Sequence, residues 1–295
     1  MISKSFLSII KPYLLLMRMD RPIGTLLLLW PTWWALWSAS NGHPDFNTWL
    51  IFTLGVFIMR AAGCVVNDIS DRKYDGHVGR TQNRPLAKNT LPVRHAWYLF
   101  FGLLLSAAVL LLFLKQLTII YALIAAFFAV TYPLMKRVTY LPQVYLGIAF
   151  SFSIPMAYAE ITGSVPKVAW LLFVTNILWT TSYDTIYAMI DRKDDLKIGV
   201  KSTAILFGDL DRIIIGIIQL LTVLALYLFG NQLEYSATYY LAVIAVIWLF
   251  VYQQLLILNR DENKCFKAFI HNNWVGMVVF LGIFSHFVMK SSFST

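Results

Sequence analysis

Two short windows of the chain concentrate acidic residues at helical spacing. Seven of the 15 acidic residues lie at 67–75 (NDISDRKYD) and 184–195 (DTIYAMIDRKDD). Residues three, four or seven apart share one face of a helix. The first window therefore predicts a stripe of Asn67, Asp71 and Asp75, and the second a stripe of Asp184, Tyr187, Asp191, Asp194 and Asp195.

Carboxylates at this spacing repel one another, which destabilises a helix unless cations balance them. Oxygen ligands without His or Cys suit a hard cation, Mg²⁺ above all. Because Mg²⁺ keeps several waters and bridges carboxylates to substrate phosphates, two such windows facing each other would hold a diphosphate between metal ions. A solvated loop explains the neighbouring Lys and Arg residues but not the acidic ones.

The two windows also resemble each other. Residues 71–79 (DRKYDGHVG) and 191–199 (DRKDDLKIG) share the pattern D-R-K-x-D-x-x-[VI]-G. This repetition predicts two pseudo-equivalent halves, marked by 67–79 and 184–199, with a site between them, as repeats in membrane proteins often have.

The segments that must position these windows are apolar. Hydrophobic residues make up 59% of the 295 residues and charged residues only 13%, whereas a soluble domain is about a quarter charged. This composition argues against a soluble, disordered or nucleic-acid-binding protein. A bilayer core needs roughly 20 apolar residues of helix, and nine such runs lie near 22–40, 48–66, 96–114, 118–135, 141–159, 166–186, 213–230, 237–258 and 272–290.

The runs are too long and too continuously apolar for barrel strands, so the sequence predicts an all-α bundle of nine transmembrane helices. Twenty Lys and Arg residues fall in the connections on one side and three on the other. The positive-inside rule then places the amino terminus and both acidic windows in the cytoplasm. Trp residues near the ends of the runs, Trp34 and Trp170 among them, are predicted to form an interfacial belt.

Several segments together resemble one family, the UbiA-type intramembrane prenyltransferases. Its first signature is similar to Asn67, Asp71, Tyr74, Asp75, Val78, Arg80, Thr81, Arg84 and Pro85, and its second to Asp184, Tyr187, Ala188, Asp191, Asp194 and Asp195. Segments 17–25 (MRMDRPIGT) and 132–137 (YPLMKR) resemble the branch that acts on 4-hydroxybenzoate. The resemblance covers roughly residues 15–290.

This resemblance implies one domain over 1–295, with its helices around a central cavity, in a bacterial inner membrane. It implies Mg²⁺-dependent transfer of a polyprenyl group from a diphosphate to the ring carbon ortho to the hydroxyl of 4-hydroxybenzoate, in ubiquinone biosynthesis. The implied metal ligands are Asp71, Asp75, Asp191 and Asp195, with Asp184, Asn67 and Asp68 at or beside the metal; Asp71 and Asp191 are expected to be essential for catalysis.

Basic residues on the cytoplasmic side are expected to share the charge of the diphosphate, as phosphate clamps do. The candidates are Arg21, Arg80, Arg84, Lys136, Arg137 and Lys201. Tyr187 is expected to contact substrate. Tyr132, one helical turn from Lys136, is expected either to line the path of the allylic cation or only to pack.

Arg60 lies inside an apolar run, where a charged side chain is costly and marks a functional site by default. It stands seven residues before Asn67, about 10 Å deeper at 1.5 Å per residue. One interpretation is that Arg60 holds the carboxylate of the aromatic acceptor bidentately. The alternative is that it pairs with a neighbouring Asp for structure alone.

Two other functions remain open from the sequence. One keeps the reaction but changes the acceptor to a naphthoate, homogentisate or haem. The other is a cation or substrate transporter, although transporters place their acidic groups near the membrane midplane and these acidic windows lie at helix ends.

Overall fold

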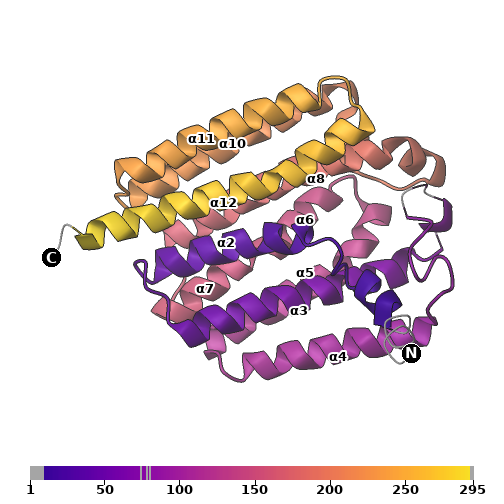
Figure 1. Ribbon diagram of the computed structural model, residues 1–295, viewed down its shortest axis with the longest axis horizontal. Coiled ribbons are helices and arrows are strands. Elements are labelled where there is room, and N and C mark those ends of the chain that lie inside the picture. Colours follow the sequence, from indigo (N-terminus) through magenta and orange to yellow (C-terminus); the bar gives the residue numbers. More distant parts are fainter. Residues whose placement is uncertain (1–9, 74, 78, 80, 293–295) are drawn as a thin grey trace, which may run out of the picture.

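The computed structural model describes residues 10–73, 75–77, 79 and 81–292, and within this part all regular structure is helical. Figure 1 shows the long helices lying side by side in one bundle, with α10 and α11 at one edge and α4 at the other. The helices are α2 (Ile23–Ala39), α3 (Phe46–Asp71), α4 (Val93–Leu111), α5 (Gln116–Val138), α6 (Pro142–Ser151), α7 (Ser153–Thr162), α8 (Lys167–Ile198), α9 (Thr203–Phe207), α10 (Asp211–Gln232), α11 (Ala237–Leu256) and α12 (Glu262–Ser292). Two 3₁₀ turns, η1 (Asp75–His77) and η2 (Gly208–Leu210), interrupt the connections.

The chain is a multi-pass membrane protein, and the predicted all-α class is confirmed. Among the described residues, seven helical segments are long and apolar enough to cross a bilayer: α3, α4, α5, α6 with α7, α9 with α10, α11 and α12. The predicted number of nine spans is not confirmed, because α2 has only 17 residues and α8 is too polar along its length. Nine spans therefore stay a prediction.

α8 is polar because it lies inside the bundle, packed against α6, α10 and α12. Its buried side includes Asn176, which donates to Ser151 Oγ at 2.9 Å, and Thr185, which shares a hydrogen bond with Thr203 at 2.7 Å. Small and hydrogen-bonding side chains let helices approach closely where lipid gives no hydrophobic drive. This internal position fixes the acidic window at the end of α8.

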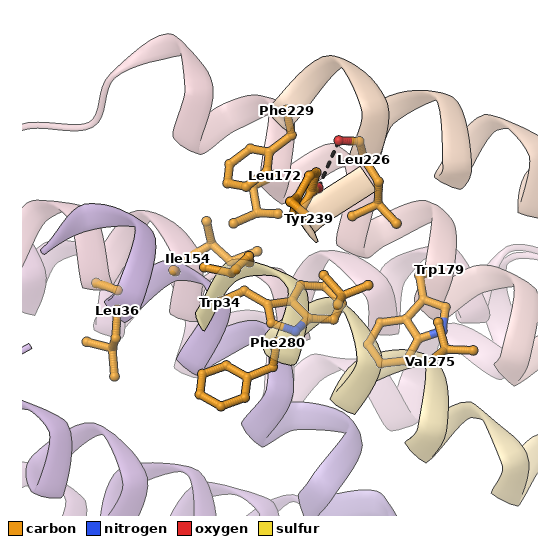
Figure 2. Packing of buried hydrophobic residues seen from close by; sticks show 14 of the residues in the cluster. Trp34, Leu36, Ile154, Leu172, Trp179, Leu226, Phe229, Tyr239, Val275 and Phe280 are labelled. Atoms are coloured by element: carbon orange, nitrogen blue, oxygen red, sulfur yellow. Dashed lines mark hydrogen bonds between the residues drawn. The ribbon is translucent and has the colours of Figure 1, made fainter. Parts of the chain in front are cut away.

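A large aromatic core holds α2 against α8 and α12 (Figure 2). The rings of Trp34 and Trp179 lie 5.2 Å apart, and their indole nitrogens donate to Gly276 O and Asn272 Oδ1, each at 2.9 Å. The prediction that Trp34 lies in an interfacial belt is wrong, because its side chain is buried in this core. An indole N–H is tolerated there because it finds a partner.

One predicted run, 141–159, is divided into α6 and α7 at Phe152. Pro155 follows three residues later; it has no N–H to donate to Ser151 O, and its ring crowds that carbonyl. α5 contains Pro133 but continues to Val138.

A buried ion-pair cluster joins three connections at the end of the bundle where α3 and α8 finish, on the right in Figure 1. The carboxylate of Asp211, at the start of α10, has no solvent exposure. It accepts from Arg260 at 2.7 Å and from Arg192 of α8 at 3.4 Å. The cluster therefore ties α8, α10 and the α11–α12 turn together.

Replacing this carboxylate should destabilise the fold strongly. Asp211→Ala leaves two guanidinium groups without their anion, and breaking such a buried pair costs about 3–5 kcal/mol. Equilibrium unfolding in mixed micelles measures the loss. Glu262→Ala is the matched control, because the Glu262 and Lys193 side chains, 3.7 Å apart, are both exposed, and such pairs contribute under about 1 kcal/mol. Equal losses in the two variants would show that the Asp211 cluster does not hold these connections.

Candidate active site

A cavity of about 710 Å³ runs between α2, α3, α4, α5, α6, α7 and α8. Its deep part is apolar and is walled by α4 and by small residues of α5, namely Ala122, Ala125, Ala126 and Ala129. Its polar part lies where α3 and α8 end. Most of the predicted site residues line it: Arg21, Arg60, Asn67, Asp68, Arg84, Tyr132, Lys136, Asp184, Tyr187, Asp191, Asp195 and Lys201.

α8 presents its acidic window to the cavity as the helical spacing predicts. Asp184, Tyr187, Asp191 and Asp195 line the wall, and the helix continues to Ile198. Gly199 ends it in the left-handed conformation, with φ +71°, which favours glycine. By contrast, Asp194 pairs with Lys197 at 3.1 Å, outside the cavity lining.

The first window departs from the predicted stripe. Asn67 and Asp68 line the cavity, but α3 ends at Asp71, and Asp75 begins the turn η1. The prediction that Asp75 continues the helical face is therefore wrong. The reason is a local one: Asp75 accepts from Arg84 Nη1 at 2.9 Å, and its carbonyl accepts from Thr81 Oγ1 at 2.9 Å. The two copies of the repeated pattern thus have different backbone structures.

Side-chain cations balance the acidic groups of the first window. Asp68, almost fully buried, accepts from Arg18 at 2.9 and 3.1 Å and lies 3.1 Å from Arg84. Lys136 of α5 lies 3.3 Å from Asp71. Because Arg84 contacts both Asp68 and Asp75, it links α3 to the connection that follows η1.

Arg18 is the residue that sequence reasoning missed. It ends the helical stretch 10–16 in the left-handed region, with φ +58°. Met19 N donates to Leu14 O and Arg18 N to Leu15 O, the Schellman arrangement that usually carries glycine. A non-glycine residue here needs a compensating contact, and the bidentate pair with Asp68 supplies it. The sequence contains no local signal for this pair, because Arg18 lies 50 residues before Asp68 and is one of four Lys and Arg residues that precede the first apolar run.

Two predicted diphosphate contacts are not on the described cavity wall. Arg137 donates to Ser70 O at 2.9 Å and lies 3.9 Å from Asp71. It lines a separate hollow with Arg72, Lys73 and Trp97, so its placement does not support a clamp inside the cavity. Arg80 lies outside the described residues. Asp71 and Asp75 are also absent from the cavity lining, but they pair with Lys136 and Arg84, which line it.

Arg60 lies in the polar part of the cavity on the same side of α3 as Asn67. Within the part of the chain that the structure describes, no hydrogen bond or ion pair joins its guanidinium to another side chain. The described residues thus show no ion pair between Arg60 and a neighbouring Asp, and the role of Arg60 stays a prediction. Tyr132 lines the same cavity with the Lys136 ammonium 5.8 Å from its ring centre.

The donors of the site fit a divalent cation bound together with substrate. Over residues 10–292, leaving aside 74, 78 and 80, no three acidic, His or Cys side chains converge into a metal cage. Mg²⁺ does not need one, because it binds through one or two carboxylates plus substrate phosphates. Asn67 Oδ1 is a buried acceptor to which no described residue donates a hydrogen bond, and a cation would satisfy it.

The electrostatics of the first window favour additional positive charge. Burial raises the pKa of Asp75 above its ordinary value, and the Arg84 guanidinium opposes this effect only in part. The neighbouring carboxylates of Asp68 and Asp71 raise the same pKa further. A cation arriving beside them would stabilise the ionised forms.

Known proteins match nearly the whole chain. The profile of the UbiA prenyltransferase family matches residues 28–281. A 4-hydroxybenzoate octaprenyltransferase from Vibrio campbellii is 54% identical over 92% of this chain and 96% of its own. Another from Colwellia psychrerythraea is 55% identical over 91% of this chain and 94% of its own.

Solved structures share the fold. An apo UbiA homolog from Aeropyrum pernix superposes with a TM-score of 0.78 at 21% identity, over 88% of this chain and 97% of its own. A UbiA homolog from Archaeoglobus fulgidus, solved bound to GPP and Mg²⁺, gives 0.68 at 16% identity, over 93% and 99%. At these identities the likeness concerns the fold alone.

The Arg18–Asp68 pair should anchor the amino-terminal segment. Arg18→Ala removes two charge-assisted hydrogen bonds from a buried carboxylate, so we expect a loss of about 2 kcal/mol in unfolding free energy and faster proteolysis within residues 10–21. Arg21→Ala is the matched control, because among the described residues the only ion pair of the Arg21 side chain is an exposed one, 3.6 Å from Asp20. Equal protease sensitivity of both variants would contradict an anchoring role.

Proposed function

The chain belongs to the UbiA prenyltransferase family, and we propose that it transfers a polyprenyl group from a polyprenyl diphosphate to 4-hydroxybenzoate. The new bond would form at the ring carbon ortho to the hydroxyl, as a step of ubiquinone biosynthesis. One observation carries the proposal: the cavity combines an acidic mouth for a diphosphate, the Arg60 guanidinium, for which the described residues supply no ion-pair partner, and an apolar interior. Identity above 50% to 4-hydroxybenzoate octaprenyltransferases over nine-tenths of the chain supports this acceptor.

The mouth of the cavity would bind the diphosphate of the donor. Asp184, Asp191 and Asp195 face Asn67 across it, and these oxygens, with Asp71 and Asp75 behind them, would hold Mg²⁺. Bound Mg²⁺ neutralises the charge that develops on the diphosphate as it leaves. Arg21, Lys136 and Lys201, also on the cavity wall, would contact its remaining oxygens.

The reaction exchanges a carbon–oxygen bond for a carbon–carbon bond. The allylic C–O bond breaks and the diphosphate departs with the electron pair. The ring carbon beside the phenol oxygen donates its electrons to the allylic carbon, and the ring then loses its proton and regains aromaticity. The apolar walls of α4 and α5 would hold the isoprenoid tail and keep water from quenching the cation.

Arg60 would fix the acceptor. Its guanidinium matches a carboxylate with two parallel hydrogen bonds. Because Arg60 lies deeper on α3 than Asn67, a carboxylate held there would direct the phenol end of the ring toward the mouth, where the donor loses its diphosphate. Tyr132 would line the path between the two.

We also propose that the acidic end faces the cytoplasm of a bacterial inner membrane. The excess of Lys and Arg in the connections at this end supports it, as do the bacterial sources of the similar sequences.

Activity should require both acidic windows and a divalent cation. We expect Asp71→Ala and Asp191→Ala each to reduce turnover to background, and EDTA to abolish wild-type activity until Mg²⁺ is added. Labelled 4-hydroxybenzoate and a polyprenyl diphosphate, supplied to purified membranes, measure this. Asp194→Ala is the control, because Asp194 lies off the cavity wall beside Lys197. Full activity in EDTA would exclude the metal-dependent reaction, and no product with this acceptor would indicate another aromatic substrate.

Removing the guanidinium should weaken acceptor binding selectively. Losing one partner of a buried charge pair costs about 3–5 kcal/mol, so Arg60→Ala should raise the KM for 4-hydroxybenzoate by a factor of hundreds. Arg60→Lys should recover only part, because a point charge cannot replace the planar fork. The KM for the donor should change little. An equal rise for both substrates would mean that Arg60 contacts the diphosphate or stabilises the fold.

A further inference from the structure

Gly24, in the first turn of α2, packs directly against the guanidinium of Arg60. A Cβ built on Gly24 would lie 2.2 Å from Arg60 Nη2, 2.6 Å from Nε and 2.7 Å from Cζ. Non-bonded heavy atoms rest about 3.5–4.0 Å apart. Any side chain at position 24 would therefore occupy the space in which the guanidinium now lies.

Backbone conformation does not explain glycine at this position. Gly24 lies in regular helix and is not among the described residues with positive φ. Alanine is a better helix former than glycine by a wide margin. Position 24 thus carries glycine because any side chain there would occupy the space of the Arg60 guanidinium.

The contact differs from other close approaches at glycines in this chain. Gly42, Gly230 and Gly276 make room for rigid aromatic rings of the core, which a Cβ would force apart. Gly24 makes room for the far end of a flexible side chain. Arg60 can withdraw without unfolding anything, so the consequence of a methyl group there falls on the position of the guanidinium.

We propose that Gly24 is a positioning residue for the aromatic acceptor, acting through Arg60; this rests on the proposed role of Arg60 as the seat of the acceptor carboxylate. The close packing of α2 on α3 at Gly24 limits where the guanidinium can lie, and so fixes the direction of its paired N–H donors. A methyl group at position 24 moves the guanidinium by about 1 Å to restore normal contact. A bidentate pair is directional, and a misplacement of this size costs up to about 100-fold in a well-oriented site.

The test compares two glycine-to-alanine variants in helices, one on the cavity wall and one away from it. Gly24→Ala should raise the KM for 4-hydroxybenzoate by roughly 10- to 100-fold and weaken its binding equally by calorimetry without donor. The donor KM and the thermal unfolding midpoint should stay at wild-type values. Gly102→Ala is the control, because a Cβ on Gly102 of α4 meets no atom within 4 Å and Gly102 does not line the cavity, so it should leave the acceptor KM unchanged.

A double-mutant cycle shows whether Gly24 acts through Arg60. If it does, Gly24→Ala adds no further loss in an Arg60→Ala background, because the displaced group is already gone. Full additivity would overturn the inference while leaving the acceptor role of Arg60 intact. The inference would also be overturned if Gly24→Ala left the acceptor KM unchanged while Arg60→Ala raised it. It would be overturned, too, if Gly24→Ala lowered stability and raised both KM values. If Arg60→Ala itself leaves acceptor binding unchanged, the proposed acceptor seat fails, and Gly24 with it.

Discussion

The balance of charge inside an apolar bundle is the constraint on which the rest of the structure depends. Carboxylates taken out of water lose hydration that only close cations and hydrogen bonds restore. At the acidic end of the bundle this balance is made by residues distant in sequence: Arg18 reaches Asp68 from before α2, and Lys136 reaches Asp71 from α5. Each pair therefore also joins two segments. The same solution recurs where Arg260 and Arg192 meet Asp211, so the charges that the site requires also hold its connections in place.

How far the sequence predicts the site follows from how local each interaction is. The stripe of Asp184, Asp191 and Asp195 depends only on helical periodicity, and α8 continues far enough to realise it. The stripe through Asp75 fails because Arg84, nine residues on, draws that carboxylate into a turn. Repetition of a pattern in sequence fixed the residue types in the two windows but not their backbone, since tertiary partners differ between the halves.

The incorrect predictions about the fold also arise from tertiary partners. The interfacial belt is inferred from the amphipathic character of Trp, but the Trp34 indole finds the carbonyl of Gly276, 242 residues away, and can be buried. The polarity of α8 reduces its resemblance to a membrane span, and this polarity reflects the packing of most of the helix against α6, α10 and α12. Apolar runs indicate that helices cross a membrane, whereas side-chain partners decide which of them face lipid. Only long-range contacts, which no local pattern encodes, distinguish a helix packed within the protein from one that faces lipid.

Against this background the position of Arg60 is informative. Three half-buried cations of the acidic end pair with carboxylates of the chain: Arg18 with Asp68, Arg84 with Asp68 and Asp75, and Lys136 with Asp71. Among the described residues, Arg60 pairs with no carboxylate, and its guanidinium packs against the backbone of Gly24.

A guanidinium that pairs with no carboxylate among the described residues adds no stability to a bundle that balances its other charges so closely. The cost is acceptable if an anion from outside completes the pair, and a carboxylate-bearing aromatic molecule fits both the charge and the walls. The same charge balance thus divides the cavity into two parts. The mouth carries carboxylates that can bind cations and, through them, phosphate, and the deeper part carries the Arg60 guanidinium, which can bind an anion. In the proposed reaction, this division would place the diphosphate and the acceptor carboxylate at successive positions along one helix, α3.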